Sequence, residues 1–475
     1  MKVRDIIEVE VTGYAFEGKG IAKINLIEGD EDLKNFVVFV ENGYPGDSAQ
    51  VKIIKKKKNY ALARIEKLLK SSDERVAPRC RYFGTCGGCK QQDLDYGSQL
   101  RYKHQQVLEI FNKLGGLEGF VSGEIIPSDN SFYYRNKMEF SFGDKRWLTA
   151  EDMNNGMEID RSYALGLHIP NMFDKVLDID ECFLQSPESN LILNFTKKFF
   201  REKNSIVYST KTHTGYLRNL AVRQSVHGKG LMVNLVTSES NSELVEEFTK
   251  GLCEVVPAVT TVVNNITSRK SSVAVGEREE VFFGDGFIYD TIGKYKFRIS
   301  ANSFFQTNTV QAEKLYEIAR KYADIKSDEV VYDLYSGAGT IAIYVSEKAK
   351  EVHGFEAVGE SIENAKQNVE INDVKNVYSH HVDLYKSFLP YLSENNVPEP
   401  DIMIVDPPRN GMHENTVNDI LELEPERIVY ISCNPATQVR DIKLLCAKYK
   451  LVRINSVDMF PHTYHIENVA LLEKI

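Results

Sequence analysis

The sequence predicts a multidomain protein of mixed class, in which two β-rich regions precede an α/β domain. The chain has 475 residues, too many for one ordinary hydrophobic core. Residues 1 to about 70 consist of short strand-like runs, and residues 71–300 continue mostly in alternating β patterns. Residues 301–475 alternate strand and helix patterns, which is typical of a parallel, doubly wound sheet. We therefore expect three domains, with boundaries near residues 70 and 300.

The composition is that of a globular protein with reduced cysteines. Hydrophobic residues make up 42% of the chain and charged residues 27%, and no run of ~18 apolar residues predicts a membrane span. The start, "MKVRDIIEVEVTG", is strand-like and carries acids early, unlike a signal peptide. Seven cysteines in such a chain are expected to be free thiols, ligands or catalysts. We therefore expect a cytoplasmic protein with no membrane partner.

The first region, residues 1–70, predicts a small β-barrel. Runs such as "IIEVEVTGYA" and "NFVVFVENG" alternate with turn signals at Gly18–Gly20 and Pro45–Asp47. Small barrels of this kind include the oligonucleotide-binding type. The segment Lys52–Lys70 is strongly basic with one acid, Glu66, although the whole chain has a net charge of −10. This run is either a solvated face or an RNA contact.

The second region, residues 71–300, has a cysteine cluster followed by strand patterns. The clearest patterns are "RNKMEFSFG", "ALGLHI", "YLRNLAVRQSV" and "GLMVNLVTS". Four cations stand among aromatic residues here, namely Arg135, Lys137, Arg218 and Arg223. They are either solvated strand edges or phosphate contacts that position a nucleic acid.

The third region, residues 301–475, begins its βα units with a glycine-rich turn. "DLYSGAGTIA" (Asp333–Ala342) reads as a strand, a turn and a helix start, and its glycines let a ligand approach the backbone closely. Glu356 ends the next strand, where a carboxylate can accept both ribose hydroxyls of an adenosine-containing cofactor. The spacing Gly337-x-Gly339-x-x-Ala342 also satisfies the loose dinucleotide fingerprint, so the loop alone does not exclude NAD.

Three chemically useful side chains follow later strands of the same sheet. "IVDPPRNG" places Asp406 after one strand, "RIVYISCNP" places Cys433 after the next, and "DMFPHTYHIENVALL" supplies Glu467 beside a further strand. A thiol and carboxylates suit the alkylation of an unreactive ring carbon. A thiolate that adds to carbon 6 of a uracil makes carbon 5 nucleophilic, and a base must then remove the carbon-5 proton.

The motifs "DPPRNG", "YISCNPAT" and "DMFPHTYHIE", in this order after "DLYSGAGT", resemble those of the RNA uracil-5-methyltransferase family, as does "SFFQTN" (Ser303–Asn308). The resemblance implies a Rossmann-like methyltransferase domain at residues 301–475, with Cys433 as nucleophile and Glu467 as base. It places six residues at the S-adenosylmethionine site, namely Gln306, Tyr335, Gly337, Glu356, Asp383 and Asp406. Many family members carry a cysteine where this chain has Ser336, which is not the nucleophile position.

The cysteine cluster "CRYFGTCGGCKQQ" offers three thiols, and "DIDECFLQ" offers a fourth. Four thiolates at Cys80, Cys86, Cys89 and Cys182 suit zinc or an iron–sulfur cluster, and their spacing leaves both open. The ribosomal-RNA branch of the family is similar in layout. This resemblance implies a 4Fe–4S cluster with a structural and RNA-binding role, and an OB-like TRAM barrel at residues 1–70, matched by "PGDSAQVKIIKKKKNYALARI".

These observations predict a cytoplasmic enzyme that methylates carbon 5 of a uridine in RNA, with 23S rRNA favoured and tRNA as the alternative substrate. No obligate protein partner is implied. A nucleotide-dependent oxidoreductase would use the glycine fingerprint and the cluster, but leaves "DPPR" and "SCNP" unexplained. A non-catalytic RNA-binding or ribosome-assembly factor would keep the fold without methyl transfer.

Overall fold

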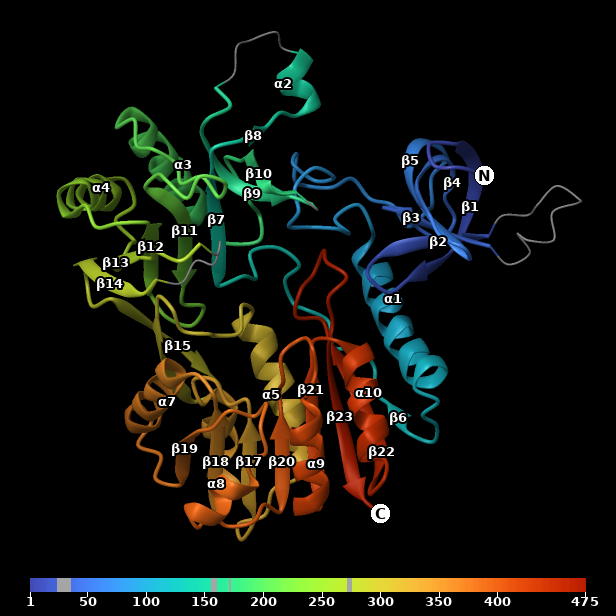
Figure 1. Cartoon of the computed structure of the whole chain (residues 1–475), viewed down its shortest axis with the longest axis vertical. Helices are drawn as coiled ribbons and strands as arrows, with labels where there is room; N and C mark the ends of the chain where they lie inside the picture. The colour runs from blue at the N-terminus through green and yellow to red at the C-terminus, as the bar shows by residue number, and fades with distance from the viewer. Residues whose placement is uncertain (24–35, 155–159, 171, 271–275) are drawn as a thin grey trace, which may run out of the picture.

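The structure, a computed structural model, describes residues 1–23, 36–154, 160–170, 172–270 and 276–475. Figure 1 shows an N-terminal barrel, a central sheet with helices, and a C-terminal sheet that lies below both.

The N-terminal residues form a closed barrel with the strand order β1-β2-β3-β5-β4. Alternate residues of β3 and β4 are buried, as expected when one face of each strand lines the barrel interior. The interior is filled by small and β-branched side chains, including Ala49, Ala61 and Ala63. The predicted barrel is thereby confirmed. Its strands are β1 (Ile6–Ala15), β2 (Lys19–Lys23), β3 (Val37–Glu41), β4 (Ser48–Lys56) and β5 (Tyr60–Lys70).

The central region is an eight-stranded mixed sheet with the order β14-β13-β12-β11-β7-β9-β10-β8. The strand patterns read from the sequence correspond to β7, β9, β11 and β12. Two helices that those patterns did not predict, α3 and α4, pack in the same core, where Phe200 and Phe248 have ring centroids 5.0 Å apart. The elements are β7 (Lys137–Gly143), β8 (Arg146–Trp147), α2 (Ala150–Asn154), β9 (Ala164–Ile169), β10 (Met172–Asp178), α3 (Pro187–Glu202), β11 (Leu217–Gln224), β12 (Leu231–Thr237), α4 (Ser242–Val255), β13 (Thr261–Ile266) and β14 (Arg278–Phe283).

The C-terminal region is a second eight-stranded sheet with the order β19-β18-β17-β20-β21-β23-β22-β6. The strands from β19 to β21 run parallel, whereas β23 is antiparallel to both of its neighbours. Every residue of β17 and β20 is buried, because helices cover both faces of a parallel sheet. The strands are β17 (Val330–Leu334), β18 (Glu351–Glu356), β19 (Val377–His381), β20 (Ile402–Val405), β21 (Arg427–Ser432), β22 (Tyr449–Val457) and β23 (Glu467–Lys474).

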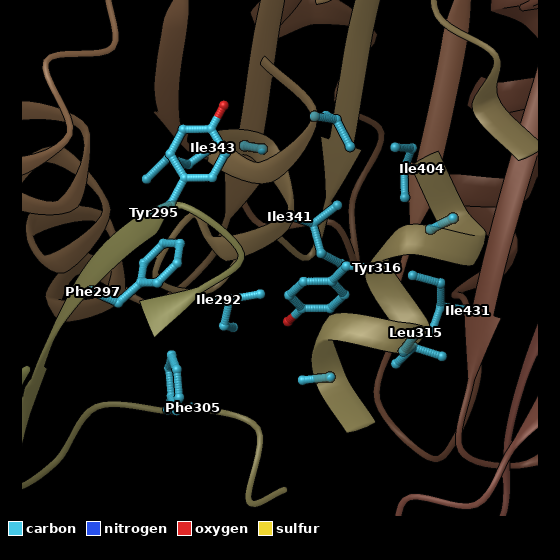
Figure 2. Packing of buried hydrophobic residues seen from close by; sticks show 14 of the residues in the cluster. Ile292, Tyr295, Phe297, Phe305, Leu315, Tyr316, Ile341, Ile343, Ile404 and Ile431 are labelled. Atoms are coloured by element: carbon cyan, nitrogen blue, oxygen red, sulfur yellow. The ribbon is translucent and has the colours of Figure 1, made fainter. Parts of the chain in front are cut away.

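Helices join these strands, and a hairpin packs beside them. The hairpin and helices are β15 (Phe287–Ile292), β16 (Tyr295–Ser300), α5 (Thr309–Ala323), α6 (Thr340–Val345), the 3₁₀ turn η3 (Ser346–Lys348), α7 (Gly359–Ile371), α8 (Leu389–Glu394), α9 (Glu414–Leu423) and α10 (Pro435–Leu445). Figure 2 shows Ile292 and Phe297 of the hairpin near Phe305 and Tyr316, and Leu315 of α5 beside Ile431 of β21. The hairpin therefore belongs to the hydrophobic core of the C-terminal sheet.

Three elements near residue 110 also contact the C-terminal sheet. They are α1 (Tyr96–Glu109), the π-helical segment η2 (Ile110–Leu114) and β6 (Val121–Ser122). The segment η2 packs against α10, and β6 pairs in parallel with β22 at the edge of the sheet. The barrel is thus joined to the C-terminal sheet by an early part of the chain, as Figure 1 shows for α1. The domain boundaries near residues 70 and 300 remain a prediction.

Candidate active site

The ends of four parallel strands bring most of the predicted cofactor-site residues to one edge of the C-terminal sheet. Gly337 follows β17, Glu356 ends β18, Asp383 follows β19, and Asp406 follows β20. In the sheet, β17 lies between β18, which follows it in the chain, and β20, which starts the other half of the sheet. The sheet therefore has its topological switch point beside the glycine loop, where doubly wound sheets bind their ligands.

The turn after β17 has the backbone of a close-approach loop. Tyr335 and Gly337 have φ angles of 66° and 56°, in the left-handed region that non-glycine residues rarely adopt. A Cβ built on Gly337 would meet no atom within 4 Å, so open space lies in front of this residue. The Glu356 carboxylate accepts the backbone N–H groups of Gly337 (3.0 Å) and Val358 (2.8 Å). The glycine loop and the next strand end are thereby fixed to each other.

A buried carboxylate beneath this loop retains an unused acceptor. Asp333 Oδ2 accepts the Ser336 hydroxyl and the Ala342 N–H, whereas Asp333 Oδ1 is buried without a hydrogen-bond partner. Burial raises the pKa of Asp333 to about 7. The Tyr335 hydroxyl lies 3.4 Å from Thr416 Oγ1 of α9, and the Tyr335 N–H donates to Phe355 O.

Cys433 and Glu467 come from neighbouring strands in antiparallel register. The sequence folds this way because "RIVYIS" forms β21 and Asn434 caps α10 by accepting the Ala436 N–H, with Pro435 at the first helical position. In the β21–β23 ladder Ser432, the last residue of β21, pairs with Asn468, so Cys433 directly follows β21 at the end where Glu467 begins β23. The Glu467 charge acts on the Cys433 thiol, so the two groups lie near one another.

The electrostatics of the space around Cys433 and Glu467 favour neutral groups. Burial, together with the charges of Glu467 and Asp406, raises the pKa of the Cys433 thiol to about 11 against the opposing effect of the Arg409 cation. Burial raises the pKa of Asp406 to about 7. Burial also raises the pKa of Glu467 well above its usual value, with Asp406 acting in the same direction and Arg409 in the opposite one. An added cation in this space would stabilise the ionised form of all three groups.

The loop between β22 and β23, residues 458–466, fixes the start of β23 and hence Glu467. Figure 1 shows this loop rising between the barrel and the central sheet. Lys103 of α1 donates to Asp458 Oδ1 (2.7 Å) and to Phe460 O (3.1 Å), and both charged side chains are at most 1% exposed. The carbonyl of His462 accepts the N–H groups of Lys90 and Gln91, next to Cys89. Lys103 was not predictable from any local pattern, because its partner lies 355 positions away.

The loop that carries Gln306 is held by the central sheet. Asn136 donates to Gln306 O (2.7 Å) and to Thr309 Oγ1 (2.9 Å), and Arg223 of β11 donates to Ala301 O (3.1 Å) and Ser303 O (2.5 Å). Arg223 is 4% exposed. Arg218 is also buried, stacks on Tyr208 and donates to backbone carbonyls. Both interpretations of these two arginines, as solvated strand edges or as phosphate contacts, are therefore wrong, since their guanidinium groups are buried and bind carbonyls inside the protein.

The four cysteines of the predicted metal set line one pocket, together with Tyr82, Phe83 and Phe183. The Gly88 N–H lies 3.3 Å from Cys86 Sγ, and Gln92 Nε2 lies 3.3 Å from Cys89 Sγ, as donors to sulfur. Burial raises the pKa of all four thiols, to about 12 for Cys89 and about 11 for Cys182. Within the described residues, no three His, Cys, Asp or Glu side chains are close enough to hold a single metal ion. A multi-iron cluster keeps its thiolate ligands farther apart than one ion does.

In the described part of the chain, no helix is long and apolar enough to cross a membrane.

The tRNA (Uracil-5-)-methyltransferase family model matches residues 272–384 and 396–475, and the TRAM domain model matches residues 1–65. A model of the CRISPR-associated protein Cas_APE2256 matches residues 184–277, within the central region.

Relatives match over nearly the whole chain. An uncharacterized RNA methyltransferase of Bacteroides thetaiotaomicron is 41% identical over 97% of this chain and 99% of its own length, and one of Chlorobaculum tepidum is 39% identical over 99% and 96%. The crystal structure of Pyrococcus abyssi tRNA (uracil-54, C5)-methyltransferase in complex with S-adenosyl-L-homocysteine is similar with a TM-score of 0.72 and 29% identity, covering 98% of this chain and all of the other. The TRAM barrel, the methyltransferase sheet and these relatives together lead to one conclusion: the chain belongs to the RNA uracil-5-methyltransferase family and is an RNA methyltransferase.

Proposed function

We propose that the protein methylates carbon 5 of a specific uridine in RNA through a covalent adduct with Cys433. The observation that carries this proposal is a thiol directly after β21 and a carboxyl group at the start of the neighbouring β23, close enough that the Glu467 charge acts on Cys433. A methyltransferase acting on a nucleophilic nitrogen or oxygen needs no thiol at this point. A uracil carbon does, because it must first be activated.

S-adenosylmethionine fits the opposite side of the crevice. The open space at Gly337, the unused Asp333 oxygen and the Glu356 carboxylate at the second strand end suit an adenosine-containing cofactor. Gln306, Tyr335, Gly337, Glu356, Asp383 and Asp406 would hold it. When bound, it supplies a methyl group on a positively charged sulfonium centre. A cation at this place also favours ionised Cys433 and Glu467.

Each of the two catalytic side chains then has one task. Cys433 adds as a thiolate to carbon 6 of the uracil, so that carbon 5 gains nucleophilic character. After carbon 5 has gained the methyl group, the Glu467 carboxylate takes the proton that remains there, and the thiolate leaves from carbon 6. One proton is released for each methyl group that is transferred. Asp406 orients the base edge between these groups.

The substrate is most consistent with structured RNA, and the target base must leave its stack to reach Cys433, at a cost of a few kcal/mol. Lys55, Lys56, Lys57 and Lys58 of the barrel are all exposed and offer phosphate contacts. The barrel and the cysteine pocket favour 23S rRNA. A tRNA substrate is the second candidate, supported by the description of the matching family model and by the Pyrococcus abyssi structure. An RNA substrate and reduced thiols are consistent with a cytoplasmic location.

A 4Fe–4S cluster at Cys80, Cys86, Cys89 and Cys182 is part of the same proposal. The residues fit it, because four thiols surround one apolar pocket and two of them receive N–H donors that stabilise thiolates. Cys182→Ser is expected to remove the visible absorbance near ~400 nm of anaerobically purified protein. The matched control is Cys253→Ser, which changes a partly buried cysteine outside this pocket. A colourless wild-type protein that retains bound zinc would assign the pocket to zinc instead.

The test of the reaction is nucleoside mass spectrometry after incubation with labelled S-adenosylmethionine and unmodified rRNA or tRNA in separate reactions. We expect labelled 5-methyluridine in one of them, and none with Cys433→Ala. Cys446→Ala, which removes a partly buried thiol at the end of α10, should retain activity. Methylation by Cys433→Ala would reject the covalent mechanism. Label in another nucleoside would reject the uracil assignment.

A further inference from the structure

A second cavity lies between the cysteine pocket and the loop that carries Gln306. It has a volume of about 310 Å³, which is in the range of small-ligand sites. Its lining includes Gly88 from the cysteine loop, Arg135, Lys137 and Glu139 from the start of β7, and Thr307 next to Gln306. We call it the Arg135–Lys137 cavity. It is large enough for a nucleotide unit rather than for a single ion.

The cavity has more positive than negative charge around it. Lys137 pairs with Glu139, its neighbour on the same face of β7. Across the β7–β11 ladder, Lys137 is directly opposed to Arg223, a pairing of like charges that is unfavourable and that Glu139 compensates in part. Arg135 lines the same space, and its Nε donates to the backbone carbonyl of Lys137 (3.3 Å). Burial lowers the pKa of Lys137, and Arg223 lowers it further.

The position of the cavity links it to the site of methyl transfer. Asn136, between its two cationic residues, points the other way and holds the Gln306 carbonyl. The Arg135 charge also acts on His465, two residues before Glu467, whose pKa is lowered to about 4 chiefly by burial. A ligand in the cavity would therefore lie beside the loops that carry Gln306 and Glu467.

We propose that the Arg135–Lys137 cavity binds a phosphodiester group that flanks the target uridine and so sets which uridine reaches Cys433. This inference rests on the proposed function. A flexible RNA strand that has one base extruded needs its neighbouring phosphates fixed, because backbone contacts determine register without reading sequence. The cavity supplies two cations for that task, one at the start of β7 and one just before it, and the hydrogen bond from Asn136 to Gln306 O ties them to the loop that carries Gln306.

The first experiment measures how methylation of a short RNA depends on salt. Lys137→Gln and Arg135→Gln should each raise the KM for RNA with little change in kcat, and lower the slope of log(kcat/KM) against log[salt] by about 0.7. The matched control is Lys145→Gln. Lys145 pairs with Asp174 and is 27% exposed, close to the 25% of Lys137, but it does not line the cavity. Arg135→Lys keeps the charge and should keep the slope.

The second experiment replaces single phosphodiesters of the RNA by neutral methylphosphonates. The wild-type enzyme should lose the same factor in kcat/KM at one flanking linkage that Arg135→Gln loses, and that variant should lose nothing more there. Equal losses in wild type and variant at every linkage would overturn the proposal. If inorganic phosphate inhibits the wild-type enzyme but not Arg135→Gln, and no methylphosphonate linkage lowers kcat/KM, the cavity binds a free anion and the proposal is overturned. Absence of methyl transfer by wild type would instead reject the proposed function.

Discussion

The buried ion pair between Lys103 and Asp458 is expected to determine whether the loop 458–466 holds Glu467 in place. In Lys103→Met, Asp458 would keep only the Tyr96 hydroxyl (2.9 Å) and the Phe460 N–H (3.2 Å) as donors, and Phe460 O would lose its ammonium donor. Breaking a fully buried pair from one side costs about 3–5 kcal/mol. Because Asp458 would keep two donors, we expect a cost near the lower end of this range.

The assay is hydrogen exchange of the peptide that covers residues 458–470, followed by mass spectrometry. At about 1.4 kcal/mol per factor of ten, a loss of about 3 kcal/mol speeds opening of the loop by about 10²-fold. Methyl transfer should fall with it, since Glu467 begins the strand after this loop. The control Lys113→Met removes a lysine that is 77% exposed and paired with Glu109, where a change below about 0.5 kcal/mol is expected.

A double variant separates the effect of the unpaired Asp458 charge from that of the altered Lys103 side chain. Asp458→Asn in the Lys103→Met background removes the unpaired carboxylate, so exchange should slow again relative to the single variant. Unchanged exchange in Lys103→Met would refute the reasoning, because it would mean that the loop is held without the pair. Faster exchange with unchanged methylation would refute the link from the loop to Glu467.

Three further predictions concern the same site. Glu467→Gln should accumulate a covalent enzyme–RNA complex that survives denaturing electrophoresis, because the proton on carbon 5 has no acceptor; normal turnover would remove Glu467 from the base role. Asp406→Asn should stabilise the ligand-free protein against urea more at pH 8 than at pH 5: burial raises the pKa of Asp406 to about 7, so the buried acid opposes folding increasingly as the pH rises from about 4 toward 7, and equal effects at both pH values would contradict this sign. Asn136→Ala should weaken S-adenosylhomocysteine binding by calorimetry through the loss of its bond to Gln306 O, whereas Asn130→Ala should not, and equal affinity would show that the loop keeps its position unaided.

Local signals were sufficient for the strands and turns of the C-terminal sheet. "RIVYISCNP" is an apolar run, a cap and a proline, and each part was found in β21, Asn434 and α10. The barrel followed in the same way from short runs between glycine and proline turns. The edge position of Asp406 and Cys433 also required only strand order, because parallel strands end on one side.

Contacts between distant parts of the chain could not be predicted. A cation among aromatic residues has the same pattern at the surface and in the interior, and the carbonyls that bind Arg223 come from a loop 78–80 positions later. The apolar run of β23 likewise does not predict that this strand inserts antiparallel between β21 and β22. Only the structure shows that Cys433 follows the strand beside the one that Glu467 begins.

The pairing of β6 with β22 joins segments more than 300 positions apart, and it has a consequence for engineering. A fragment that begins at residue 301 would expose the edge of β22, leave Asp458 without Lys103, and free the Gln306 loop from Asn136. Such a fragment should aggregate through its open sheet edge rather than behave as a portable methyltransferase. Chimeras that exchange the barrel among relatives should therefore retain the segment 96–136 of the catalytic parent.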